Sequence, residues 1–215
     1  CALPISNANL FSRGDKALVV ATGSFGHSWA NAVRRMGVEV DILEFGKQRR
    51  ADTEQIEHAL RADKAHSIRA VLLTHVDTAS TVRNDVAAVR AAIDAARHPA
   101  LLAVDCIASL GCDPFFMDQW GVDVMVAACQ KGLMTPPGLA FVWFSEAARL
   151  RCGQAFAESG HAPRGPVQSA EVDKLVWGVD AGIGGGKSKL EAYTSPAFTE
   201  KMANAAPSNT SYICT

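Results

Sequence analysis

Short apolar runs alternate with longer amphipathic stretches between Lys16 and Cys152. The runs that are apolar enough to form buried strands are residues 16–23, 38–45, 69–76, 99–111, 121–130 and 139–145. The stretches that place apolar side chains at helical spacing are residues 27–37, 52–62, 84–97 and 146–152. Strands of Val, Leu, Ile and Ala that alternate with helices are typical of a doubly wound, mostly parallel sheet covered on both faces. We therefore predict an α/β fold of this kind.

The carboxyl ends of the predicted strands indicate where a functional site should lie. In an open parallel sheet, ligands bind beyond these ends. The segments that follow the strands are 22–29 (TGSFGHSW), 74–81 (THVDTAST), 104–111 (VDCIASLG) and 129–138 (CQKGLMTPPG). We expect the chemistry of the protein to come from these segments.

Composition limits the partners that the chain can have. It has 215 residues, a formal net charge of -1 and 48% hydrophobic residues, which suffices for one core of ordinary size. The near-neutral charge gives no electrostatic footprint for nucleic acid or for an anionic membrane. No apolar run approaches the roughly 20 residues that span a bilayer. The six cysteines include no C-x-x-C pair. We interpret them as reduced residues of a cytoplasmic protein and predict no metal site.

The domain boundaries follow from changes in composition. We place one ordered domain at residues 7–152, and we interpret Cys1 to Ser6 as a scar that does not belong to it. Residues 153–215 form an unassigned Gly- and Pro-rich segment, either a linker or unrelated sequence. Residues 181–188 (AGIGGGKS) fit a relaxed phosphate-binding loop, so nucleotide binding is one alternative; a flexible glycine linker is the other.

Lys131 and Asp105 carry the clearest chemistry. Lys131 directly follows an apolar run, and a lysine amine in a partly desolvated pocket has a lowered pKa and can form a Schiff base with an aldehyde. Pyridoxal phosphate is the cofactor that exploits this most often, and it needs a carboxylate beside its ring nitrogen. Asp105, at the end of another apolar run, can supply that carboxylate. Taken singly, Lys131 could equally extend into solvent and Asp105 could cap the next helix.

The combination resembles a known family. VDCIASLG, followed by GVDVMVAACQKGLMTPPGLAF, is similar to the class V pyridoxal-phosphate-dependent aminotransferases, in particular to the alanine–glyoxylate and serine–glyoxylate group. The resemblance runs from about Leu10 to Cys152. It implies an incomplete large domain of a fold-type-I transferase, and a homodimer. It also implies an enzyme that moves an amino group from alanine or serine to a 2-oxo acid such as glyoxylate.

The resemblance also implies a role for each matching residue. Lys131 would hold the cofactor as an internal aldimine and then transfer protons, and Asp105 would pair with the ring nitrogen. Phe25 would stack on one face of the ring, and Ile107 would pack on the other. Two further matching residues are a hydroxyl near the ring oxygen and a glutamine that seats the cofactor at its phosphate, namely Thr78 and Gln130.

The chain also departs from the family pattern. Cys129 replaces the usual serine before Gln-Lys. The turn that cradles the cofactor phosphate and the arginine that clamps the substrate carboxylate have no match, so a catalytically silent fragment is an alternative. A cysteine desulfurase is a further alternative, although that group usually has His before the lysine. We interpret His27 and His75, which flank the predicted pocket, as hydrogen-bonded structural residues, although either could assist proton transfer.

Overall fold

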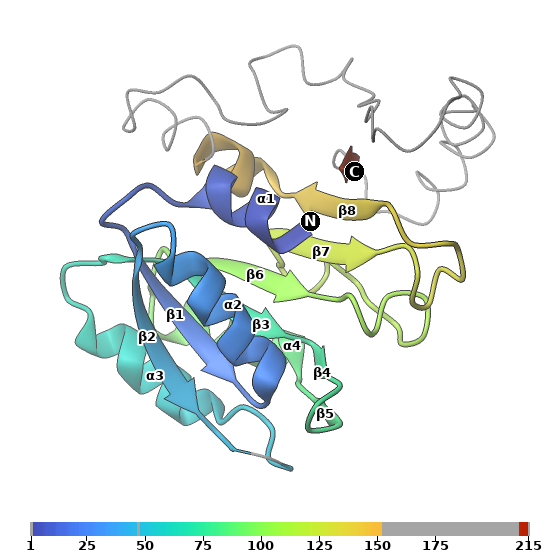
Figure 1. The fold of residues 1–215 in the computed structure, drawn as a ribbon. Coiled ribbons are helices and arrows are strands. Elements are labelled where there is room, and N and C mark those ends of the chain that lie inside the picture. Colours follow the sequence, from blue (N-terminus) through green and yellow to red (C-terminus); the bar gives the residue numbers. More distant parts are fainter. Residues whose placement is uncertain (1, 47, 152–210, 215) are drawn as a thin grey trace.

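The computed structural model describes residues 2–46, 48–151 and 211–214. Its central feature is a sheet in the order β2-β1-β3-β6-β7-β8-β9 (Figure 1). The strands are β1 (Lys16–Ala21), β2 (Glu39–Glu44), β3 (Ile68–Thr74), β6 (Leu101–Asp105), β7 (Val124–Ala128), β8 (Ala140–Phe144) and β9 (Ser211–Cys214). β2, β1, β3, β6 and β7 are parallel, whereas β8 and β9 are antiparallel to their neighbours. The predicted doubly wound, mostly parallel sheet is thus confirmed.

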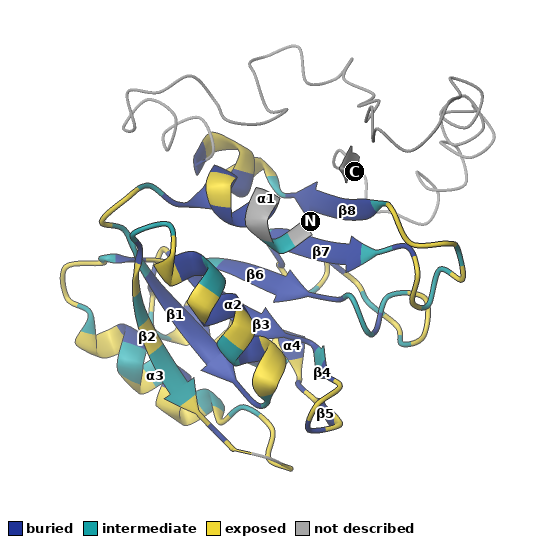
Figure 2. Ribbon diagram, in the orientation of Figure 1, coloured by how far each residue is buried: buried dark blue, intermediate teal, exposed yellow. Residues whose placement is uncertain are grey.

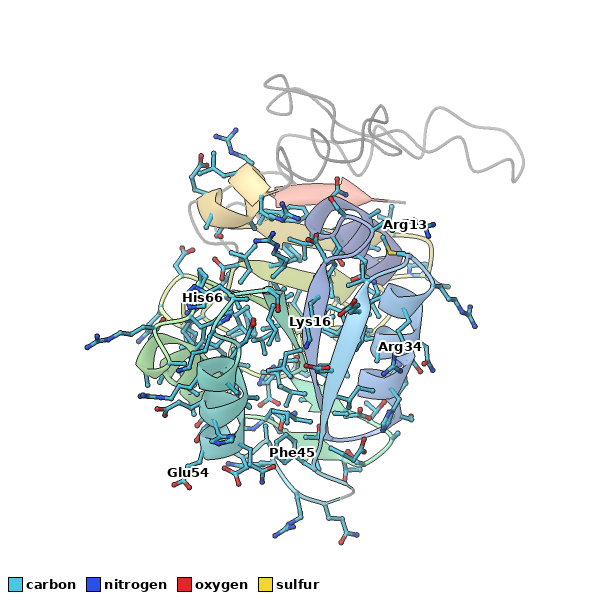
Figure 3. All side chains as sticks on the ribbon, turned by 90° about the vertical axis from the view of Figure 1, so that its left-hand side faces the viewer. Arg13, Lys16, Arg34, Phe45, Glu54 and His66 are labelled. Atoms are coloured by element: carbon cyan, nitrogen blue, oxygen red, sulfur yellow. The ribbon has the colours of Figure 1, made fainter. Side chains whose placement is uncertain are left out.

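Helices cover both faces of the sheet. They are α1 (Ala2–Leu10), α2 (Ser24–Arg34), α3 (Thr53–Ala62) and α4 (Val86–Ala95). One core cluster packs α3 and α4 against the sheet, and a second packs α1 and α2 against the opposite face. Figure 3 shows this in edge view, with Glu54 of α3 on one side of the sheet and Arg34 of α2 on the other. The strands β1, β3, β6, β7 and β8 are almost wholly buried, whereas the edge strand β2 is partly exposed (Figure 2).

α3 and α4 begin within two residues of the predicted stretches, whereas α2 begins three residues earlier than predicted and α1 was not predicted as a helix. The helices are capped in two different ways. The Asp52 carboxylate accepts from the Glu54 amide at 3.0 Å before α3, and Asp85 caps α4 in the same manner. These local caps satisfy amides that have no partner within the helix. α2 follows Gly23, which has no side chain to cap it. The first turn of α2 therefore depends on a group from elsewhere in the chain.

Two segments differ from the prediction or fall outside the structure. Residues 2–6 of the segment interpreted as a scar lie within α1, where Ser6 is buried, and the next residue, Asn7, accepts a 2.8 Å hydrogen bond from the Trp29 indole. It therefore packs as part of the domain. Most of residues 153–215, including 181–188, lies outside the described residues, and only Ser211–Cys214 is seen there, as β9. No helix in the described ranges is both long and apolar enough to cross a membrane.

A small hairpin after β3 is absent from the sequence prediction. It consists of β4 (Val76–Asp77) and β5 (Val82–Arg83), which pair antiparallel. Strands of two residues are too short to produce an alternating hydrophobic pattern. The hairpin loop, residues 78–81, projects from the carboxyl edge of the sheet and carries Thr78.

Candidate active site

Parallel pairing brings the predicted segments to one edge of the sheet. Thr74 of β3 lies opposite Asp105 of β6, and Asp105 lies opposite Val126 of β7. Beyond the strands, the His75 amide donates to the Asp105 carbonyl at 2.9 Å, and the Cys106 amide donates to the Val126 carbonyl at 2.8 Å. The chain after β3, the chain after β6 and the chain after β7 therefore leave the sheet side by side.

Asp105 is a buried carboxylate with unused hydrogen-bonding capacity. Asp105 is the last residue of β6 and is 5% exposed. Its Oδ1 accepts a hydrogen bond from the Ile107 amide at 2.8 Å. Burial, with a smaller contribution from the negative charge of Asp77, raises the pKa of Asp105 to about 6. Among the described residues, no cation pairs with it. A buried carboxylate of this kind favours a positively charged ligand group.

Lys131 lies in a loop that is organised around Cys129. The Cys129 thiol donates to the Pro136 carbonyl at 2.9 Å and accepts from the Leu139 amide at 3.4 Å, while the Thr135 hydroxyl donates to the Cys129 carbonyl at 3.0 Å. These contacts close the loop between β7 and β8. Lys131 and its neighbour Gln130 are exposed. The closed loop thus holds the lysine at the surface, directly beyond the end of β7.

Two glycines bring the lysine loop into contact with the segment that follows Asp105. A β-carbon on Gly132 would overlap the carbonyl oxygen of Leu110, and one on Gly111 would come within 2.8 Å of the Gly132 carbonyl. Gly111 also has a φ of 84°, a conformation that favours glycine. The backbone beside Lys131 is therefore packed directly on the turn after Asp105. Lys131 and the turn that follows Asp105 therefore belong to two adjacent segments that touch.

Phe25 and Thr78 lie on two further segments of this edge. Phe25 is in the first turn of α2 and is 47% exposed. Thr78 is exposed in the hairpin loop. Ile107, two residues beyond Asp105, is half-buried. These side chains offer an aromatic surface, a hydroxyl and an aliphatic surface that a ligand could cover.

The two histidines have structural partners, as interpreted from the sequence. His75 is buried, its Nδ1 lies 2.9 Å from the Ser109 hydroxyl, and burial lowers its pKa. Its ring packs against Phe115 and Trp120 beside a cavity of about 220 Å³. His27 pairs with Glu44 at 3.0 Å on the surface.

Asp77 and Asn84 organise this edge, although neither was predicted from the sequence. Asn84 donates from Nδ2 to the Thr22 hydroxyl at 2.9 Å and to the Thr74 carbonyl at 2.8 Å, and accepts from the Ala51 amide at 2.9 Å. Asp77 binds the first turn of α2 through its carboxylate. Each links segments that are far apart in the chain, and no local sequence signal reveals such partners.

The chain is similar in sequence to known aminotransferases. The family model described as aminotransferase class-V matches residues 2–182. An L-aspartate–glyoxylate aminotransferase from Paracoccus denitrificans is 49% identical over 140 residues, 65% of this chain and 35% of that protein. A serine–glyoxylate aminotransferase from Methylorubrum extorquens is 47% identical over 141 residues, 66% of this chain and 35% of that protein.

A solved aminotransferase structure is similar to this chain in fold. An alanine–glyoxylate aminotransferase from Nostoc sp. superposes with a TM-score of 0.66 at 27% identity, covering 71% of this chain and 39% of that one. The described sheet and its helices thus have the fold of these enzymes. The chain spans 35% of the length of the two curated relatives. The family match covers most of the sequence, and the chain belongs to the class-V aminotransferases.

Proposed function

We propose that this chain is part of a pyridoxal-phosphate-dependent aminotransferase that moves an amino group from a small amino acid, alanine or serine, to a 2-oxo acid such as glyoxylate. The observation that carries the proposal is that the loop with Lys131 touches the turn that follows Asp105, beyond the adjacent strands β6 and β7. The two curated relatives and the Nostoc enzyme are all named as glyoxylate aminotransferases, which supports glyoxylate as the acceptor.

The residues present fit pyridoxal phosphate. Asp105 is buried without a cationic partner among the described residues, so a protonated ring nitrogen would complete its environment. Lys131 is exposed on the loop that touches the turn after Asp105 and would supply the amine for covalent attachment. When bound, this cofactor supplies an aldehyde for that attachment and a ring that draws electrons from the substrate.

The chain's own residues then have distinct tasks. Asp105 would favour a protonated ring nitrogen by placing a negative charge against it. The Lys131 amine would take the proton from the substrate α-carbon and, as an ammonium, give it up again. Phe25 and Ile107 would shield the ring from water, while Thr78 would offer a hydroxyl to the ring oxygen and Gln130 an amide to the phosphate.

The proposal also covers the oligomeric state and the cellular location of the enzyme. We infer a homodimer in the cytoplasm, with a small amino acid and a 2-oxo acid as its substrates. The homodimer follows from the family resemblance, and the location from the composition of the chain. Because the chain is only part of the length of its relatives, other segments of the intact protein would complete the substrate site.

An absorbance measurement tests cofactor attachment. Protein that is mixed with pyridoxal phosphate and dialysed should keep a visible absorbance band, and the band should be absent from Lys131→Ala. Lys64→Ala is the matched control, because Lys64 is an exposed lysine in the turn after α3, far along the chain from the site. A wild-type protein without a band would refute cofactor binding and leave a catalytically silent fragment.

A second measurement tests the reaction. The intact protein should consume alanine or serine only when glyoxylate is present, and glycine should accumulate in equal amount. Release of sulfide from cysteine without glyoxylate-dependent transfer would point instead to a cysteine desulfurase.

A further inference from the structure

α2 lacks a local cap, and a distant carboxylate takes that place. The residue before α2 is Gly23, and no side chain adjacent to the helix caps it. Instead, Oδ2 of Asp77 accepts from the Phe25 amide at 3.1 Å and from the Gly26 amide at 3.3 Å. Asp77 is fully buried, and its negative charge faces the positive end of the helix dipole. The first turn of α2 is thus fixed from a strand that lies about 50 residues downstream.

The same carboxylate also fixes its own hairpin. Oδ1 of Asp77 accepts from the Ala79 amide at 3.1 Å, and the Asp77 carbonyl accepts from the Ser80 amide at 3.2 Å. These bonds shape the start of the loop that presents Thr78. Both oxygens of the carboxylate are therefore used as acceptors, one toward α2 and one toward the hairpin loop.

Gly23 makes this arrangement possible. A β-carbon at this position would overlap the Asp77 carboxylate, so only glycine allows the carboxylate to lie against the backbone before α2. The φ of Gly23 is -179°, which any residue can adopt. The requirement for glycine is therefore one of space alone.

We propose that Asp77 is a positioning residue of the cofactor site, which holds the aromatic surface of Phe25 and the hydroxyl of Thr78 in a fixed relative position. The proposal rests on the proposed function, because Phe25 and Thr78 are the groups expected to contact the cofactor ring. Asp77 itself is buried behind them and acts only through the backbone that carries them.

Two substitutions perturb this link in different ways. In Asp77→Asn, one oxygen becomes an NH₂ group, which faces backbone N–H donors and loses either the α2 bonds or the Ala79 bond. In Gly23→Ala, the carboxylate is intact but the added methyl group separates it from α2. Asp52→Asn is the matched control, because it removes the charge of the aspartate that caps α3 and leaves the proposed site untouched.

The first readout uses protein without cofactor. Amide hydrogen exchange measured by NMR should accelerate at Phe25 and Gly26 or at Ala79 in Asp77→Asn, and at Phe25 and Gly26 in Gly23→Ala. Asp52→Asn should leave exchange at Phe25, Gly26 and Ala79 unchanged. Unchanged exchange at Phe25, Gly26 and Ala79 in both site variants would overturn the proposal.

The second readout uses protein loaded with pyridoxal phosphate. Both site variants should bind it on the order of tenfold more weakly. They should also give a smaller visible circular dichroism per bound cofactor, since that signal reports how the ring is held. If the variants only lost stability, their unfolding midpoint would fall while the circular dichroism per bound cofactor stayed the same. That result would overturn the positioning role of Asp77 and leave the proposed function standing. A wild-type protein that binds no cofactor would overturn the proposed function, and this inference with it.

Discussion

Replacing Asp105 with asparagine should stabilise the cofactor-free protein while weakening cofactor binding. Asparagine has nearly the same shape and can keep the 2.8 Å hydrogen bond from the Ile107 amide. What it removes is a negative charge that is 5% exposed and has no cationic partner among the described residues. Such a charge is unfavourable in the empty site and useful only when the ring nitrogen is present.

The magnitude follows from the pKa of Asp105. Burial raises it from 3.8 to about 6, and each unit corresponds to about 1.4 kcal/mol. The unfolded chain therefore loses its proton at lower pH than the folded protein, so ionisation favours unfolding. The free energy of unfolding that is lost through ionisation of Asp105 grows as the pH rises. It is about 1.5 kcal/mol near pH 5 and about 3 kcal/mol near pH 7.5, where Asp105 is ionised in both the folded and the unfolded state. The Asp105→Asn variant should be more stable than the wild type by this amount at each pH.

Urea unfolding of the wild type and of Asp105→Asn at both pH values tests the reasoning. The stabilisation should roughly double between about pH 5 and about pH 7.5. Asp63→Asn is the control of opposite sign. Burial acts to raise the pKa of Asp63, but hydrogen bonds from Ile68 and Ser67 outweigh it and bring the pKa to about 2. Neutralising Asp63 should therefore destabilise the protein at neutral pH.

Two results would refute this reasoning. The first is an Asp105→Asn variant that is less stable than the wild type near neutral pH, which would mean that the carboxylate has a favourable partner in the cofactor-free protein. The second is a stability difference that does not change with pH, which would mean that the pKa of Asp105 is not raised. In either case Asp105 would not be an unpaired buried carboxylate that favours binding of a protonated ring nitrogen.

Three further outcomes are expected. Pyridoxal phosphate binding, followed by visible absorbance, should weaken as the pH falls below about 6, because Asp105 then gains a proton, and this dependence should be absent from Asp105→Asn. Phe25→Ala should weaken cofactor binding by roughly tenfold in equilibrium dialysis, and Phe25→Trp should not, because the stacking surface remains. Cys129→Ser should keep the bond to the Pro136 carbonyl, whereas Cys129→Val should cost about 1–3 kcal/mol in urea unfolding, since that carbonyl loses its donor.

The strands and the chemistry of the site were open to prediction from local signals. The runs at residues 99–111 and 121–130 are apolar enough to identify buried strands, and they contain β6 and β7. Asp105 and Lys131 stand out because a charged residue within or directly after such a run needs a reason to be there. The hairpin of β4 and β5 escaped prediction because its strands are too short for any periodicity.

Tertiary structure alone decided how these groups meet. Asp77 caps a helix about 50 residues earlier in the chain, and Gly111 and Gly132 bring two loops into contact. Such contacts depend on strand order and register, which no window of sequence contains. By itself, the sequence determined which residues carry charge, an aromatic ring or a hydroxyl at the strand ends. The fold determined their neighbours, and burial at the sheet edge determined that Asp105 holds its proton more tightly than an exposed aspartate.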